Sequence, residues 1–230
     1  MPSGHGVTRT DPVLAAGIGL RRGWGWAVRA ASFRISSPAP GSSNTLGILI
    51  DHPAQASAIV DLLAGLARPA YGELRVLGHD MATIRGRAVV RRRVGVARRN
   101  ARSLSGMRVR RLVEHAARLS GPGRHDRSAL AAAILDRLSL LPWAEVKLRA
   151  APDAIARRAR LAAAAVHQPD LLLLDGLLDG LSFREVTVLA QAIRDLSRDS
   201  AILLVGCDSS ALDLACDEVL VLTDGVLVSA

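Results

Sequence analysis

The stretch GILIDHPAQASAIVDLLAGL, residues 47–66, has the layout of a phosphate-binding loop. An apolar strand leads into a short loop, and the loop leads into an apolar helix, whose free N–H groups attract phosphate. Such loops use glycines to curl the backbone around phosphate, a lysine to neutralise it, and a Ser or Thr to hold magnesium. The segment DHPAQASA contains neither glycine nor lysine, and the only lysine of the chain is the distant Lys147.

Two residues at the start of this helix have chemistry of their own. Pro53 lacks an N–H group and suits the first helical turn. Asp51 precedes it, where a carboxylate can cap the helix. We therefore expect Asp51 to supply, from within the chain, the negative charge that a phosphate would bring, and to repel phosphate. An ordinary capped helix start would have the same structure.

Cys207 is the other residue with reactive potential, since it follows an apolar run and precedes Asp208. Its neighbourhood in sequence contains no histidine to activate a thiolate, so a small buried residue is the favoured interpretation. The two cysteines and the histidines show no metal-ligand spacing, and we expect neither a metal site nor a disulfide framework.

Charge is distributed unevenly along the chain, whose formal net charge is +9. Residues 82–118 hold 12 arginines and one acid, whereas residues 170–230 hold 11 acids and three arginines. This asymmetry predicts a basic surface for an acidic partner. A solvated arginine face explains it equally well.

The elements that must position these residues alternate between strand and helix, which predicts an α/β fold. Strands are expected at residues 17–22, 27–35, 45–50, 73–78, 89–97, 170–175, 200–206 and, as a hairpin turning at Asp-Gly, 218–230. Helices are expected at residues 55–67, 108–140 in two pieces broken by GPGRHD, 153–167, 184–199 and 210–217. Residues 1–11 are expected to form a flexible tail and residues 12–230 a single domain. No apolar run reaches membrane-spanning length, and the start lacks a signal-peptide core, so a cytosolic location is expected.

Four stretches, in order and spacing, resemble the ATP-binding cassette, the nucleotide-binding subunit of ABC transporters. They are LLAGLARPAYGELRVLGHD, RRRVGVARR, HQPDLLLLDGLLDGL and ACDEVLVLTDGVLV, and the resemblance covers about residues 13–230. It implies a P-loop NTPase-like core, an N-terminal antiparallel β part and a helical subdomain at about residues 98–158. It also implies the family's usual role, in which paired cassettes bind and hydrolyse ATP and drive a membrane subunit.

The chain departs from the family at the positions that handle phosphate. The glycines of the phosphate loop fall on Ile50, Pro53 and Gln55, the lysine falls on Ala56, and only Ser57 keeps a compatible type. The vestigial nucleotide-binding positions that the resemblance implies are Asp51, Pro53, Gln55, Ala56, Ser57, Ala58, Trp24, Arg99, Asp175, Gly176 and Cys207.

Asp175 falls on the magnesium-linked aspartate of the Walker B strand, and Gly176 replaces the catalytic glutamate that follows it. Without that carboxylate, no neighbouring group polarises an attacking water. Asp175 and Ser57 could hold a cation weakly, but a structural role for Asp175 is favoured.

The remaining motifs follow the same trend. The signature sequence falls on APDAI, residues 151–155, where Pro152 and Asp153 predict a helix start whose carboxylate opposes phosphate. The Q-loop glutamine falls on Arg99, the D-loop aspartate on Ser182 and the switch histidine on Cys207. Trp24 lies near the adenine-stacking position, with Arg22 and Trp26 as alternatives.

These departures lead to the hypothesis of a non-catalytic cassette, with MgATP binding weak or absent and no catalytic residue. Its partner would be a membrane permease subunit at the inner face of the plasma membrane, together with a second, competent cassette if the chain pairs at all. The arginines expected to dock this partner are Arg98, Arg99, Arg102, Arg108, Arg110 and Arg111. The alternatives are an arginine-rich nucleic-acid-binding module, disfavoured by the scarcity of aromatics, and a weak ATPase with an unusual site.

Overall fold

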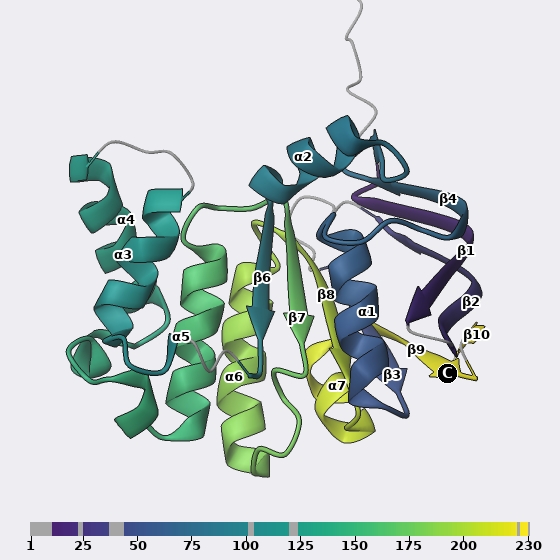
Figure 1. The fold of residues 1–230 in the computed structure, drawn as a ribbon. Helices are drawn as coiled ribbons and strands as arrows, with labels where there is room; N and C mark the ends of the chain where they lie inside the picture. Colours follow the sequence, from purple (N-terminus) through teal and green to yellow (C-terminus); the bar gives the residue numbers. More distant parts are fainter. Residues whose placement is uncertain are drawn as a thin grey trace, which may run out of the picture.

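The computed structural model describes residues 11–22, 25–36, 44–100, 104–119, 124–224 and 226–229. They form two β-sheets, with one helix between the sheets and most of the others on the far side of the larger sheet (Figure 1). The α/β class predicted from the sequence is confirmed. Trp24 and Arg102 lie outside the described residues.

The smaller sheet has the strand order β2-β1-β4-β5. Its strands are β1 (Val13–Arg22), β2 (Gly25–Ile35), β4 (Tyr71–Val76) and β5 (His79–Asp80). β1 pairs antiparallel with both β2 and β4, which confirms an antiparallel N-terminal β part. β1 and β2 are both longer than the strands predicted at residues 17–22 and 27–35.

The larger sheet has the order β10-β9-β3-β8-β7-β6. Its strands are β3 (Thr45–Ile50), β6 (Val94–Arg98), β7 (Leu171–Asp175), β8 (Ala201–Gly206), β9 (Glu218–Thr223) and β10 (Val226–Ser229). All pair in parallel except β9 with β10, which form the predicted hairpin. β7 and β8 are buried along their whole length, as continuous apolar runs predict.

Helix α1 (Pro53–Leu63) lies between the two sheets. It begins two residues earlier and ends four residues earlier than the helix predicted at residues 55–67. The predicted strand at residues 89–97 is wrong in its first half, because Ile84–Arg93 form helix α2 and β6 starts only at Val94. The Thr83 hydroxyl caps α2 by accepting the Gly86 N–H at 3.0 Å, a start signal that the run of arginines obscured.

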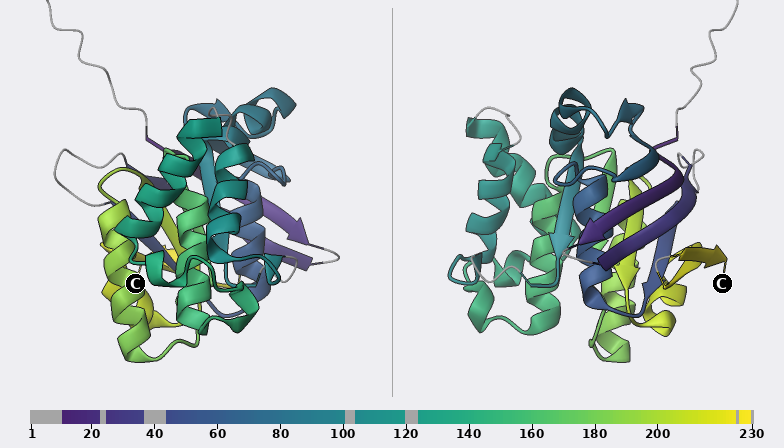
Figure 2. Two further views of the ribbon diagram at one scale, coloured as in Figure 1. Left: turned by 90° about the vertical axis from the view of Figure 1, so that its left-hand side faces the viewer. Right: turned by 45° about the vertical axis from the view of Figure 1, so that its right-hand side comes forward.

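The far face of the larger sheet carries α5 (Asp153–Ala165), α6 (Phe183–Leu196) and α7 (Ser209–Ala215). Helices α3 (Val109–Leu119) and α4 (Arg124–Arg137) pack against α5 rather than against the sheet. Two short 3₁₀ turns, Leu141–Trp143 and Leu148–Ala150, connect α4 to α5. Figure 2 shows α3 and α4 standing at the end of the molecule beyond α5. None of the helices in the described ranges has both the length and the apolar character needed to cross a bilayer.

Apolar side chains form one core cluster on each face of the larger sheet. Successive residues of β7 alternate between them, with Leu172 and Leu174 in the helical cluster and Leu171 and Leu173 in the α1 cluster. Because β3, β6, β7 and β8 run parallel, their carboxyl ends meet at one edge of the sheet. The candidate residues Asp51, Arg99, Gly176 and Cys207 each come directly after one of these strands.

Candidate functional site

The loop between β3 and α1 is closed by its own residues. His52, with an extended backbone, is the N-cap of α1, and its Nδ1 accepts the Ala54 N–H at 3.2 Å. The Gln55 side chain reaches back and accepts the His52 N–H at 3.3 Å, completing a capping box. Pro53 is the first helical residue, as predicted. The N–H groups that would face a phosphate are therefore engaged with His52.

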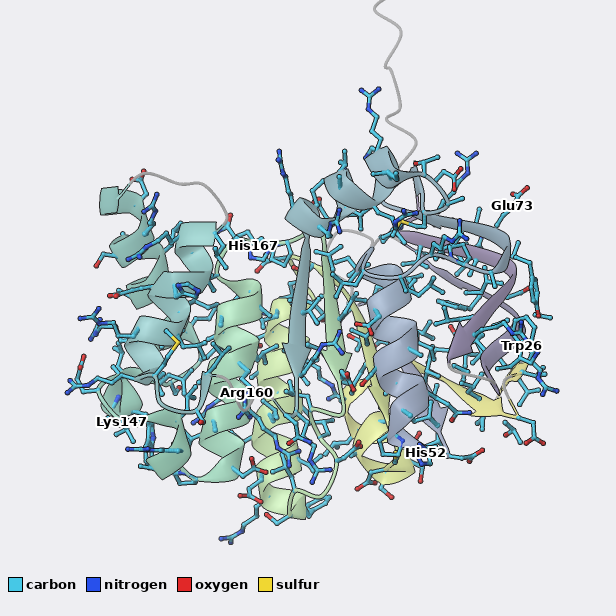
Figure 3. All side chains as sticks on the ribbon, viewed as in Figure 1. Trp26, His52, Glu73, Lys147, Arg160 and His167 are labelled. Carbon is cyan, nitrogen blue, oxygen red and sulfur yellow. The ribbon has the colours of Figure 1, made fainter. Side chains whose placement is uncertain are left out.

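The predicted capping role of Asp51 is wrong. Asp51 is exposed and lies one residue before the N-cap, so its carboxylate is too early in the chain to accept from the first turn. The first turn of α1 contains no acidic residue. His52 could not be chosen from its type, because histidine is not among the usual capping residues. Figure 3 labels it at the lower end of α1.

Ser57 and Asp175 meet directly, as their implied positions suggested. The Ser57 hydroxyl donates a hydrogen bond of 2.9 Å to Asp175 Oδ2. The neighbouring Ala56, at the lysine position, is only 2% exposed, and Ala58 is 3% exposed. This turn of α1 therefore packs methyl groups into the core where a phosphate loop would present a cation.

Arg98 supplies the cation at this point. Its Nη1 lies 3.2 Å from Asp175 Oδ2, and its Nη2 forms a second ion pair with Asp61 on α1. Arg98 was expected to face a docking partner, but its guanidinium is turned inward between two carboxylates. Burial raises the pKa of Asp175, while the Ser57 hydrogen bond and the Arg98 charge oppose that shift. Asp61, which sequence reasoning missed, is the third member of this cluster.

Gly176 adopts a left-handed conformation, with φ of +62°, at the position of the family's catalytic glutamate. Its N–H donates to the Val205 carbonyl at 2.8 Å, and an added Cβ would lie 3.1 Å from Asp179 Oδ2. Arg99 lies across this loop, because an added Cβ at Gly180 would be 3.3 Å from Arg99 Nη2. The loop is thus folded around two glycines and one arginine.

Cys207 is exposed, which corrects the prediction of a small buried residue. It directly follows β8, at the edge of the sheet where the carboxyl ends of the parallel strands lie. Its backbone N–H donates to Asp179 Oδ1 at 3.0 Å. Partial burial and the nearby Asp179 carboxylate raise the pKa of its thiol. A raised pKa disfavours the thiolate, so this cysteine has the electrostatics of an unreactive thiol.

The segment that corresponds to the signature sequence forms the start of α5, as predicted. Asp153 is its first residue and pairs with Arg157, which lowers the pKa of the carboxyl. Arg157 is 1% exposed and also donates to the Leu177 and Asp179 carbonyls at 3.0 and 2.7 Å. Arg157 therefore fastens α5 to the loop after β7. Nothing in its sequence context distinguished it from its neighbouring arginines.

Two further implied positions have structural partners. Ser182, at the D-loop position, is the N-cap of α6, and both its N–H and its hydroxyl donate to Glu185. Trp26, the alternative to Trp24 for adenine stacking, packs edge-on against Tyr71 with ring centroids 5.2 Å apart.

The arginine cluster is partly paired on the surface. Arg108 and Arg110 both bind Glu145, at 2.8 and 2.9 Å, and together they lower the pKa of that carboxyl. Arg99 and Arg111 are exposed. The five predicted docking arginines that the structure describes therefore do not form one uniform basic face.

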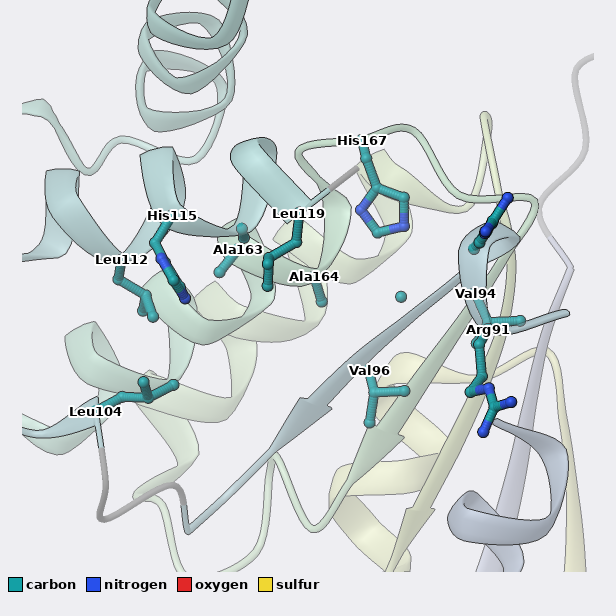
Figure 4. Close-up of a pocket in the computed structure, with 13 residues that line it drawn as sticks. Arg91, Val94, Val96, Leu104, Leu112, His115, Leu119, Ala163, Ala164 and His167 are labelled. Atoms are coloured by element: carbon teal, nitrogen blue, oxygen red, sulfur yellow. The ribbon is translucent and has the colours of Figure 1, made fainter. Parts of the chain in front are cut away.

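A groove runs beside the edge strand β6, between it and helices α3 and α5. Its larger hollow, of about 730 Å³, extends to the arginines at the end of α2 (Figure 4). A smaller hollow, of about 250 Å³, opens toward Arg98 and Arg160. The two hollows share the lining residues Val96, Leu104, Leu112 and Ala163. We call them together the β6 groove.

Known proteins resemble this chain in both sequence and fold. Two curated relatives are the methionine import ATP-binding protein MetN 2 of Burkholderia mallei and the ABC transporter ATP-binding protein NatA of Bacillus subtilis. MetN 2 is 27% identical over 186 residues, covering 79% of this chain and 47% of that protein. NatA is 24% identical over 204 residues, covering 88% of this chain and 80% of that protein. The chain thus spans about half the length of MetN 2.

Solved structures show the same architecture. The cbiO1 protein of Clostridium perfringens, part of the ABC transporter complex cbiONQ, superposes with a TM-score of 0.82 at 16% identity, covering 95% of this chain and 87% of that one. An ATP-binding cassette bound to ADP and phosphate gives a TM-score of 0.75 at 15% identity, covering 94% and 96%. The predicted P-loop NTPase-like cassette fold is therefore confirmed.

The family model described as ABC transporter matches residues 56–178, which is more than half of the chain. The match starts at Ala56, immediately after the capped loop, and extends past Asp175. The chain belongs to the ABC transporter family of ATP-binding cassettes.

Proposed function

We propose that this chain is a non-catalytic cassette of an ABC-type transporter. It docks on a membrane permease subunit at the cytoplasmic face of the membrane and has a structural or regulatory role there. The observation that carries the proposal is the Arg98 guanidinium, which pairs with Asp175 at 3.2 Å while Ser57 donates to the same carboxylate oxygen.

The residues present do not fit a magnesium–phosphate group. A bound magnesium needs carboxylate and hydroxyl oxygens that are free to coordinate it, whereas Asp175 Oδ2 already accepts from Ser57 and Arg98. A bound phosphate needs free N–H groups at the helix start, whereas those of Ala54 and Gln55 bond to His52. The paired cluster satisfies internally the charges that a nucleotide complex would otherwise balance.

The loop after β7 supports the same proposal. Gly176 provides no carboxylate to polarise a water, and its left-handed backbone penalises a glutamate at that position. The segment at the start of α5 binds its own Asp153 to Arg157. This arrangement favours a structural or regulatory role over completing the ATP site of a second cassette.

Two measurements on the intact chain test the proposal. Isothermal titration with MgATP should give no heat of binding, and phosphate release should not exceed that of an Asp175→Ala variant. Micromolar affinity for MgATP, or release that depends on Asp175, would overturn the non-catalytic assignment.

A variant with an altered cluster sharpens the test. Arg98→Gln removes the internal cation and leaves Asp175, Asp61 and Ser57 in place. If the guanidinium is what excludes a metal, Mn²⁺ should bind this variant more tightly than the wild type, as measured by electron paramagnetic resonance. An Arg98→Gln/Asp175→Asn double variant is the control and should lose the gain.

A further inference from the structure

A separate hollow lies between the N-terminal halves of α5 and α6, which stand side by side on the far face of the larger sheet (Figure 1). We call it the α5–α6 hollow. Its volume is about 390 Å³, within the range of roughly 300–1,000 Å³ that is usual for small-molecule sites. It shares no lining residue with the β6 groove.

The walls of the α5–α6 hollow are largely apolar. Ile155 lines it from α5, and Val188 and Leu189 line it from α6. Trp143, in the 3₁₀ turn that follows α4, adds an indole ring. Val188 is 52% exposed although it lies on the helix face that lines the hollow. Walls of this kind favour a ligand with an apolar, preferably aromatic, body.

Arg158 is the buried cation of this hollow. Its Nε atom is buried without a hydrogen-bond partner, and its guanidinium makes no hydrogen bond or ion pair with any described residue. Burial lowers the pKa of Arg158, and no neighbouring carboxylate in the described residues opposes that shift. Arg160 differs in this respect, because Asp153 attracts it. The charge of Arg158 is therefore unbalanced within the described part of the chain.

Glu185 is the one acid among the described residues that line the hollow, and it is engaged elsewhere. Its carboxylate accepts from the Ser182 N–H at 2.9 Å and from the Ser182 hydroxyl at 2.6 Å. These hydrogen bonds lower the pKa of Glu185. Arg184, exposed at the rim, makes no ion pair with a described residue. The hollow thus offers two arginines and no carboxylate that is free to pair with them.

We propose that the α5–α6 hollow binds a small aromatic carboxylic acid whose carboxylate pairs with Arg158. The Nε and one Nη of a guanidinium form a fork that matches the two oxygens of a carboxylate. One buried guanidinium balances one negative charge, whereas a phosphate ester carries close to two. A monocarboxylate therefore fits better than a phosphate ester.

The aromatic body of the acid would lie against Trp143 and against the apolar side chains of both helices. It would then bridge the start of α5 to the start of α6. Arg157, the residue before Arg158, already fastens α5 to the loop after β7. A bound acid should therefore stabilise this end of the molecule and raise the melting temperature of the protein.

The first experiment compares three probes on the intact wild-type chain by isothermal titration. 2-Naphthoate, 2-naphthamide and 2-naphthylmethylamine share one ring system and differ in the charge of the head group. 2-Naphthoate should bind saturably, the amide should bind at least tenfold more weakly because it lacks the charge, and the amine should not bind. Equal affinity for acid and amide, or no saturable binding of the acid, would overturn the proposal.

The second experiment assigns the charge to one arginine. Arg158→Gln should bind the acid and the amide equally. Arg160, labelled on α5 in Figure 3, supplies the matched control, because it also has buried donors without a partner in the described residues but lines the β6 groove. Arg160→Gln should keep the wild-type preference for the acid. Equal loss of preference in both variants would show that net charge, and not the hollow, attracts the acid.

The third experiment blocks the hollow without removing a charge. Val188 is exposed enough for a larger ring to be tolerated, so Val188→Trp should fold, fill the hollow and abolish 2-naphthoate binding. Unchanged binding would contradict the assigned location. Circular dichroism establishes that each variant is folded, and the comparison of acid with amide on the wild type decides the matter even if Arg158→Gln does not fold.

Binding at this hollow requires neither a permease nor a nucleotide, so it goes beyond the proposed function and fails separately from it. MgATP binding would overturn the non-catalytic role and leave the 2-naphthoate result standing. Absence of 2-naphthoate binding would remove the acid site and leave the non-catalytic role intact.

Discussion

The cluster around Asp175 and the hollow around Arg160 both include Arg98 of β6, and they treat charge in opposite ways. In the cluster, Arg98 is shared by Asp175 and Asp61, and Ser57 completes the set. In the hollow, Arg160 has buried donors with no partner in the described residues. The first region is complete without a ligand. The second leaves two buried donors unpaired within the described residues.

This difference predicts how each kind of arginine contributes to stability. Buried ion pairs contribute little net stability but are costly to break, because the remaining partner stays buried without compensation. An unpaired buried charge costs stability in the free protein, and a partner that pairs with it recovers that cost. The comparison therefore predicts that arginines of these two kinds respond oppositely to removal.

The largest effect is expected at Arg157, which lies three residues before Arg160 on α5. Arg157→Met should destabilise the protein by roughly 3 kcal/mol, because the Leu177 and Asp179 carbonyls lose their donor at about 1–3 kcal/mol each. Arg160→Met should leave the free energy of unfolding unchanged or raise it by up to about 1 kcal/mol. Urea denaturation measures both, and similar losses for the two variants would break the comparison.

Removal of Arg98 should cost about 2 kcal/mol at neutral pH, as expected for hydrogen bonds to a charged group. Arg98 stabilises the ionised form of Asp175, so its contribution is present above the folded-state pKa of that carboxyl and is lost as the pH falls through it. Burial raises this pKa, so the loss should begin above about pH 4, the ordinary range for Asp.

Denaturation of wild type and Arg98→Gln between pH 3 and pH 7 tests this dependence. The exposed neighbour Arg99 supplies the control, because Arg99→Gln should change stability by no more than about 0.5 kcal/mol. A difference between Arg98→Gln and wild type that stays constant across this range would show that the Asp175 carboxylate is not its target.

Gly176 sharpens the comparison at the loop beside the cluster. Gly176→Ala should cost about 1–2 kcal/mol because its φ of +62° is unfavourable for a residue with a Cβ. Gly176→Glu should cost at least as much and should not produce phosphate release. Thermal melts measure the stability of both variants, and a phosphate-release assay measures hydrolysis. Hydrolysis by Gly176→Glu would show that the missing carboxylate alone prevents catalysis in the wild type.

The smallest effect is expected at the start of α1. His52→Ala should destabilise by about 1 kcal/mol through loss of the N-cap, the size measured for other caps. Asp51→Ala should be neutral. A larger loss for Asp51→Ala than for His52→Ala would restore the capping role that the sequence suggested for Asp51.

The sequence predicted the scaffold better than the contacts. Buried strands such as β7 are continuous apolar runs, and such a run predicts a strand whatever elements flank it. The meeting of Ser57 with Asp175 followed from the family resemblance, which puts both residues at the magnesium position. The inward turn of Arg98 did not, because its partner Asp61 is 37 residues away on α1 and appears in the sequence as an ordinary helix-surface acid.

The errors at Asp51 and Cys207 have a common physical origin. Both residues lie at the carboxyl ends of strands, where a shift of one residue decides whether a side chain caps, is buried or faces solvent. Sequence patterns fix strands and helices to within a few residues, and loop geometry depends on that last residue. The strand predicted at residues 89–97 is wrong in its first half for a related reason, since the arginines of α2 conceal the Thr83 cap.

The hydrogen bonds of Asp179 couple the loop after β7 to α5 and to the end of β8. Its carbonyl accepts from Arg157 on α5, and its carboxylate accepts the Cys207 N–H after β8. Exchange of the Cys207 amide with deuterated solvent requires that this bond opens, although the side chain of Cys207 is exposed. Because Asp179 is also held by Arg157, the start of α5, the loop after β7 and the end of β8 should exchange as one cooperative unit.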